Sequence, residues 1–103
     1  MRMTADSIPV GYTLATGLIT RAALTGNRYH FKTTNSPQVC YNPSSLVEIL
    51  GVPAEFVTSG DRSIHGPTVE KMTKPYEGIL RFEMSDGTTQ TYSTGETFYL
   101  WRY

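Results

Sequence analysis

Two turn dipeptides, Gly26-Asn27 and Asp86-Gly87, constrain the fold of this chain more than any other feature of its sequence. Each lies between segments rich in β-branched and aromatic residues, at 10–24 and 28–33 around the first and at 78–84 and 88–93 around the second. Dipeptides of this kind favour tight β-hairpin turns, because glycine and asparagine tolerate the left-handed backbone that these turns require. The sequence therefore predicts two antiparallel hairpins.

The first hairpin has a register that separates apolar from basic side chains. Pairing Thr25 with Arg28 collects the apolar groups on one face, with these residues opposite each other: Leu24 and Tyr29, Ala22 and Phe31, Thr20 and Thr33. The other face then carries the only concentrated positive patch of the sequence, made of Arg21, Arg28, His30 and Lys32.

The second hairpin has two registers that the sequence leaves open. A two-residue turn pairs Phe82 with Thr91 and turns Tyr92 away from the core. A three-residue turn over 85–87 with a bulge instead pairs Leu80 with Tyr92 on the core side. The return strand, 88–93, is otherwise polar, which is typical of a sheet edge.

The segment between the hairpins predicts one broken helix from about residue 43 to 58. Asn42-Pro43 is a good start for a helix, and Leu46, Ile49 and Leu50 follow at helical spacing. Gly51 ends the first part, and Pro53 begins a short turn that carries apolar residues. We therefore expect an α+β fold, in which this helix closes a small curved antiparallel sheet or open barrel of five or six strands.

Residues 45–60, Ser-Leu-Val-Glu-Ile-Leu-Gly-Val-Pro-Ala-Glu-Phe-Val-Thr-Ser-Gly, resemble the two closing helices of phage-repressor-type helix-turn-helix domains. The DNA-reading helix of that family precedes this pair, whereas the preceding residues here are predicted to be strands. The resemblance therefore implies a helix-turn-helix packing unit and transfers no DNA-binding residue to this chain.

Composition limits the class of protein. A chain of 103 residues is expected to form one domain, 1–103. Nine Lys and Arg balance nine Asp and Glu, so no global field attracts nucleic acid or an anionic membrane. One cysteine, Cys40, excludes an internal disulfide framework, and no apolar stretch has the length of a signal peptide or a membrane span. These features predict a cytoplasmic protein that does not bind membranes.

The C-terminal segment 98–103 is the richest in aromatic residues. Its period of two puts Tyr99, Trp101 and Tyr103 on one face, opposite Phe98 and Leu100. Such a face is either buried in the core or left open as a contact surface, and the sequence leaves both readings open. Residues 59–75 are expected to form a long loop, a second place where contacts concentrate.

No motif in the sequence specifies a reaction. His65 lies near Asp61 and is a candidate general base, but no nucleophile or oxyanion site accompanies it. Cys40 with His30 or with His65 is a candidate thiolate pair, although a buried and inert cysteine is the favoured interpretation. We expect no enzymatic activity, no catalytic residue, no cofactor and no metal site.

The function that these observations favour is non-enzymatic protein binding, as in a small phage- or plasmid-type accessory or inhibitory protein that blocks a partner. The expected contact residues are Tyr99, Trp101, Arg102, Tyr103, Arg62 and His65. The alternative is single-stranded nucleic-acid binding, in which the C-terminal aromatics stack on bases beside Arg21, Arg28, His30 and Lys32. A homodimer through the aromatic strand or the polar edge at 88–93 is also open.

Overall fold

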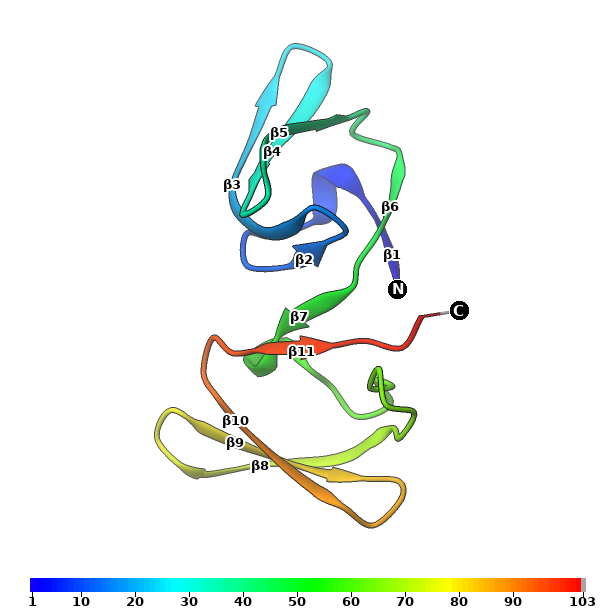
Figure 1. Ribbon diagram of the computed structural model, residues 1–103, viewed down its shortest axis with the longest axis vertical. Coiled ribbons are helices and arrows are strands. Elements are labelled where there is room, and N and C mark those ends of the chain that lie inside the picture. Colours follow the sequence, from blue (N-terminus) through cyan, green and yellow to red (C-terminus); the bar gives the residue numbers. More distant parts are fainter. Residues whose placement is uncertain (103) are drawn as a thin grey trace. The chain divides into compact units, whose positions relative to one another are not determined.

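A computed structural model describes residues 1–102 of the chain, which fold mostly into β-strands (Figure 1). The strands are β1 (Arg2–Thr4), β2 (Thr13–Leu14), β3 (Gly17–Thr25), β4 (Arg28–Thr33), β5 (Ser36–Tyr41), β6 (Leu46–Glu48), β7 (Gly51–Pro53), β8 (Val69–Tyr76), β9 (Ile79–Met84), β10 (Thr89–Ser93) and β11 (Thr97–Tyr99). Two 3-10 helices of three residues, η1 (Ala5–Ser7) and η2 (Ala54–Phe56), are the helices of this part of the chain.

The chain divides into two compact units, Met1–Gly51 (unit 1) and Val52–Tyr103 (unit 2). In unit 1, strands β2, β3, β4 and β5 follow one another in a sheet, and β1 pairs with β6. In unit 2, β8, β9 and β10 form a three-stranded meander with β10 at its edge, as the polar sequence of this strand predicts, and β11 lies next to β7. The expectation that residues 1–103 form one domain stays a prediction.

The predicted α+β fold with a helix at 43–58 is wrong: this segment forms β6, β7 and η2. Burial alternates here with a period of two, because Val47 and Ile49 are buried while Leu46 is 65% exposed. Leucine and isoleucine at 46, 49 and 50 satisfy a helical pattern equally well, but the β-branched residues at 47, 49 and 52 favour strands. The helix-turn-helix packing unit implied by the resemblance at 45–60 is therefore absent from the described structure.

The two units share one backbone plan, although their sequences show no repeat. Each contains a strand, a 3-10 helix, a loop, a three-stranded meander and a final strand in the same order; the loop of unit 1 also contains the short strand β2, where that of unit 2 has the isolated bridges of Arg62 and Ser63. The residue after each helix, Ile8 or Val57, donates its N–H to the carbonyl of Ala5 or Ala54 at 3.4 and 3.2 Å. The first helical N–H then donates to the residue that precedes the final strand, Ser45 in unit 1 and Glu96 in unit 2.

The strand registers of the two meanders agree around the bulge in their first strand. In unit 1, Ile19 pairs with Thr33 and Arg21 with Lys32, with a bulge between the two pairs. In unit 2, Val69 pairs with Met84 and Lys71 with Glu83, with a bulge at the same place. The pairs on either side of this common bulge can therefore be compared between the units, whereas β8 and β9 have a second shift, between Thr73 and Tyr76, that β3 and β4 lack.

The cores of the two units are built at the same positions. The corresponding buried residues are Ala5 and Ala54, Ile8 and Val57, Leu14 and Ser63, Ile19 and Val69, Phe31 and Phe82, Val47 and Phe98, Ile49 and Leu100. Phe82 packs edge-on to Phe98 with ring centroids 5.5 Å apart, and Phe31 packs on Tyr41 at 6.0 Å. Apolar burial of this kind stabilises each unit around its own aromatic centre.

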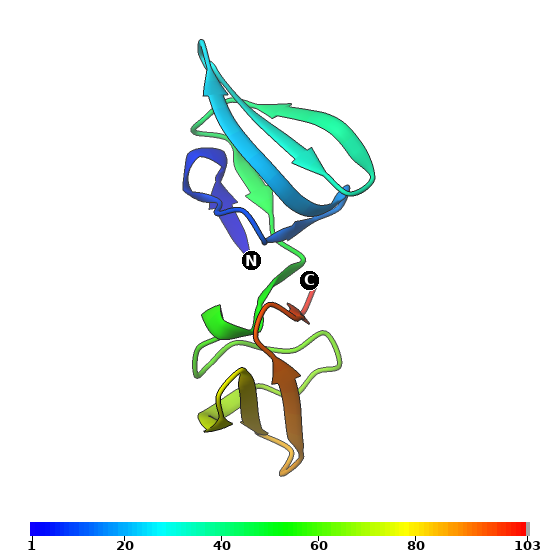
Figure 2. The same cartoon turned by 90° about the vertical axis from the view of Figure 1, so that its left-hand side faces the viewer.

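The first hairpin confirms the predicted register near the turn, where Thr25 pairs with Arg28 and Leu24 with Tyr29. Gly26 has a φ of 62°, as the turn requires. The expected pair of Thr20 and Thr33 is wrong, because the bulge leaves Thr20 without a partner in the register and sets Ile19 opposite Thr33. Figure 2 shows how β3, β4 and β5 curve as they continue from this turn.

The second hairpin adopts the bulged alternative, in which Leu80 pairs with Tyr92 and the Tyr92 ring packs on Phe82 at 5.3 Å. Asp86 stabilises this turn by accepting hydrogen bonds from the Thr88 N–H at 3.0 Å and from the Thr88 hydroxyl at 2.6 Å. The predicted loop at 59–75 is too long, because 69–76 form β8. Pro75 lies where the β8 register shifts, which is a place that tolerates a residue without an N–H.

Candidate functional site

The aromatic residues of the C-terminal segment meet the loop of unit 2 that precedes β8. The Ile64 N–H donates to the Tyr99 carbonyl at 3.0 Å, and the Trp101 N–H donates to the Arg62 carbonyl at 2.9 Å. Between these bonds, Ser63 forms a β-bridge with Leu100. The structure therefore brings together Tyr99, Trp101 and Arg62, which the sequence placed in separate candidate regions.

The side chains of this site form a stack. The Arg62 guanidinium carbon lies 3.9 Å from the centre of the Trp101 ring, and the Arg62 Nε–H donates to the Gly66 carbonyl at 2.8 Å. A Cβ atom at Gly66 would be in ordinary van der Waals contact with the Trp101 ring. A cation over an indole ring gains about 0.5–1 kcal/mol at an exposed site, so the pair holds its own geometry. We call Arg62, Ile64, Tyr99 and Trp101 the aromatic corner.

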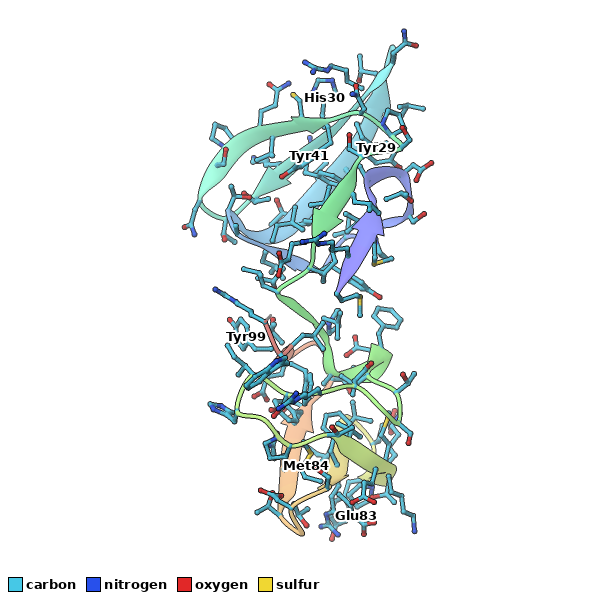
Figure 3. The ribbon with its side chains drawn as sticks, turned by 90° about the vertical axis from the view of Figure 1, so that its right-hand side faces the viewer. Tyr29, His30, Tyr41, Glu83, Met84 and Tyr99 are labelled. Carbon is cyan, nitrogen blue, oxygen red and sulfur yellow. The ribbon has the colours of Figure 1, made fainter. Side chains whose placement is uncertain are left out.

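The aromatic corner is partly open to solvent. Tyr99 is 49% exposed and Ile64 37% exposed, whereas Phe98 and Leu100 on the opposite face are buried. Trp101 is half-buried, and Arg62, His65 and Arg102 are exposed. Figure 3 shows the Tyr99 side chain on its strand. The predicted alternation is thus confirmed through Trp101, while Tyr103 lies outside the described residues.

Hydrogen bonds to neighbouring residues hold the loop that contains Arg62. The Gly60 N–H donates to the Val69 carbonyl, and the Val69 N–H donates to the Asp61 carbonyl, both at 2.8 Å. The Asp61 carboxylate accepts the Thr58 N–H at 3.0 Å, so it is engaged in the turn, and no hydrogen bond links it to the exposed His65. The geometry therefore gives no support to a base at His65 that is oriented by Asp61.

The second predicted site lies on the outward face of β3 and β4 in unit 1. Arg21 lies directly opposite Lys32, Ala23 opposite His30 and Thr25 opposite Arg28. All four basic residues therefore share one face, as the register predicts. We call Arg21, Arg28, His30 and Lys32 the basic face, and Figure 3 shows His30 on it.

Two further polar residues of β5 belong to this face: Cys40, which the sequence suggests as a partner of His30, and Gln38, which it does not identify. Cys40 pairs with His30 across β4 and β5, and its Sγ lies 3.1 Å from His30 Nδ1. Gln38 Nε2 donates to the same ring nitrogen at 2.7 Å. Cys40 is half-buried rather than fully buried. A period-two reading of 36–41 puts Gln38 and Cys40 on one side, but only the β4–β5 register places His30 beside them.

A hollow of about 220 Å³ opens on the basic face, and its lining includes Arg21, His30, Lys32 and Gln38. A hollow of about 300 Å³ in unit 2 has a lining that includes Glu70 and Glu83, the second of which corresponds to Lys32 in the strand register. Within residues 1–102, no three His, Cys, Asp or Glu side chains group as metal ligands. No helix in the same range is long and apolar enough to cross a bilayer.

Comparison with models of protein families, with characterised proteins and with solved structures gives no match for this chain.

Proposed function

We propose that the protein is a non-enzymatic interaction protein, which binds another protein through the aromatic corner of unit 2. The observation that carries this proposal is the Arg62–Trp101 stack, which lies beside a Tyr99 that is half exposed. Tryptophan, tyrosine and arginine are the residues that most often anchor protein interfaces, because each combines a large contact area with a polar group.

The shared backbone plan supports this proposal, because the fold does not require the stack. In unit 1 the Leu50 N–H donates to the Thr13 carbonyl at 2.8 Å, which corresponds to the bond from Trp101 to Arg62 in unit 2. Unit 1 therefore forms the same backbone contact with a leucine and a threonine. The cation and the indole are additions at the surface of unit 2, and they need an explanation other than folding.

The fixed backbone around the corner favours binding further. Because Arg62 and Trp101 are held by backbone hydrogen bonds and by each other, little side-chain freedom remains to be lost when a partner covers them. An accessory or inhibitory protein that covers a partner's surface needs such a preorganised patch. The exposed Arg102 and His65 extend the patch with polar groups at its margin.

Site-specific photo-crosslinking tests the proposal. A photoreactive phenylalanine analogue replaces Tyr99 in one variant and Tyr76, which is 72% exposed on the hairpin of the same unit, in a control variant. In cells that express the protein, we expect a defined crosslinked protein from position 99 and none from position 76. The crosslink should disappear when Trp101→Ala is added.

Two results would contradict the proposal: no crosslinked protein at position 99, or a crosslink that Trp101→Ala leaves unchanged. A crosslink between two copies of the chain would show that the corner is a homodimer interface. That outcome would overturn the proposal of a different protein as partner.

A further inference from the structure

The basic face of unit 1 contains a pair of like charges that the fold does not need. Arg21 and Lys32 lie directly opposite each other in the β3–β4 ladder, where like charges repel. The corresponding pair in unit 2 is Lys71 and Glu83, which attract. The same backbone thus accepts a favourable pair at this position, and unit 1 carries an unfavourable one.

Neighbouring groups do not neutralise these cations. Within residues 1–102, no acidic side chain forms an ion pair with Arg21, Arg28 or Lys32. The hollow beside them is lined by basic and neutral residues, whereas Glu83, the counterpart of Lys32 in unit 2, lines a hollow together with a second carboxylate, Glu70. The position of Lys32 therefore carries a negative charge in unit 2 and a positive one in unit 1, where no carboxylate lines the hollow, which points to a negatively charged ligand in unit 1.

His30 adds a hydrogen-bond donor to the face. Its Nδ1 accepts the Gln38 amide N–H at 2.7 Å, so in the neutral ring the proton is on Nε2. Arg28, His30 and Lys32 alternate along β4, and two residues of a strand advance by about 7 Å. Donors and cations therefore recur along one line, at intervals similar to those between successive phosphates of an extended nucleic-acid strand.

We propose that the basic face binds the phosphodiester backbone of a single nucleic-acid strand, with one phosphate in the hollow between Arg21 and Lys32 and the next ones towards Arg28. Tyr99 and Trp101 belong to unit 2, and the residues of unit 1 alone carry the binding proposed here. The His30 ring is the aromatic group available here. Binding therefore rests on phosphates and shows little base preference.

The test is a fluorescence anisotropy titration of a short labelled oligothymidylate with the full chain, repeated at several salt concentrations. Three cations on a single strand predict a log–log salt slope of about −2, which is a roughly 20-fold loss of affinity between about 50 and 200 mM salt. The variant R21Q/K32Q should bind at least about tenfold more weakly at low salt, with a slope of about −0.7. K71Q/K74Q changes the net charge equally on the hairpin of unit 2 and should bind as the wild type does.

Three results would overturn this proposal: no salt-dependent binding, equal losses in both double variants, or tighter binding of polyglutamate than of the oligonucleotide. The last result would assign the face to an acidic protein. Because R62A/W101A changes only unit 2, it should keep oligonucleotide binding and lose the crosslinked partner. The two proposals therefore stand or fail separately.

Discussion

Exchanging Lys32 for glutamate should make the protein more stable while removing its affinity for nucleic acid. The variant Lys32→Glu replaces the Arg21–Lys32 pair by an opposite-charge pair, which is the arrangement that unit 2 has at Lys71 and Glu83. A cross-strand charge pair contributes about 0.2–1 kcal/mol, with the sign set by the charges, and exposure keeps the value near the lower end. Removing the repulsion and gaining the attraction together give about 0.5–1 kcal/mol.

This free energy converts into a measurable shift in melting temperature. For a chain of 103 residues the unfolding entropy is about 0.2 kcal/mol/K, so the expected rise in Tm is about 2–5 °C. The assay is thermal unfolding followed by circular dichroism at low salt and at 1 M salt, where the Debye length falls to about 3 Å. The gain should disappear at 1 M salt, because it is electrostatic.

The reciprocal variant is the matched control. Glu83→Lys creates in unit 2 the like-charged pair that unit 1 has naturally, and it should lower Tm by a similar amount at low salt. The reasoning is refuted if Lys32→Glu fails to raise Tm at low salt, or if its effect persists at 1 M salt. If Lys32→Glu stabilises the protein but still binds oligothymidylate as the wild type does, the proposed binding of nucleic acid by the basic face is refuted.

Three further predictions concern unit 2 and the glycine turns. Ser63 Oγ is buried without a hydrogen-bond partner, so Ser63→Ala should raise the free energy of unfolding by about 1 kcal/mol in urea titrations; a loss of stability would contradict this. Burial and the charge of Glu96 raise the pKa of Tyr92 above 10.0, so the contribution of Tyr92 to stability is complete below pH 10 and is lost as the pH rises through the raised pKa. Tyr92→Phe should therefore lose less stability at alkaline pH than the wild type does, and equal alkaline profiles would show that Tyr92 does not cause the loss. Gly17 and Gly66 both have φ near 115°, but a Cβ at Gly17 would collide with Thr34. Gly17→Ala should therefore lower the free energy of unfolding by about 1–3 kcal/mol, which is more than Gly66→Ala should, and equal losses would show that backbone conformation alone determines the effect.

The sequence predicted the hairpins because their information is local. Gly26-Asn27 fixes the turn, and the turn fixes the pairing of the residues beside it, until the bulge at Thr20 ends the regular register. The two registers of the second hairpin could not be separated, because the choice depends on whether Tyr92 reaches Phe82 in the core. That contact is a property of the folded unit.

The helix prediction failed because short apolar segments fit two periods. Leu46, Ile49 and Leu50 match a helical face, while Val47 and Ile49 match a strand face, and the core of unit 1 selects the second. Tertiary pairing with β1 decides the outcome, since Val47 lies opposite Met3 in the ladder. This pairing joins distant parts of unit 1 and leaves no local signal.

The sequence identified most residues of the candidate sites, but it did not predict the contacts that bring the residues of the aromatic corner together. The aromatic residues near the C-terminus and the arginine in the loop were both identified, but only the β-bridge of Ser63 with Leu100 puts Arg62 over Trp101. On the basic face, the hairpin register was sufficient to group the four basic residues. Gln38 needed the third strand, whose register shifts between Phe31 and Thr33 and could not be read from spacing.

Comparison of corresponding positions in the two units shows which side chains the shared backbone requires and which it does not. Positions that define the backbone keep their character, as at Ala5 and Ala54 in the helices and at Phe31 and Phe82 in the cores. Two surface positions differ in chemistry: Lys32 in unit 1 stands where unit 2 has Glu83, and the Arg62–Trp101 stack of unit 2 stands where unit 1 has Thr13 and Leu50. These are the two places, one in each unit, at which we propose binding, because the shared backbone forms in the other unit without the same side chains.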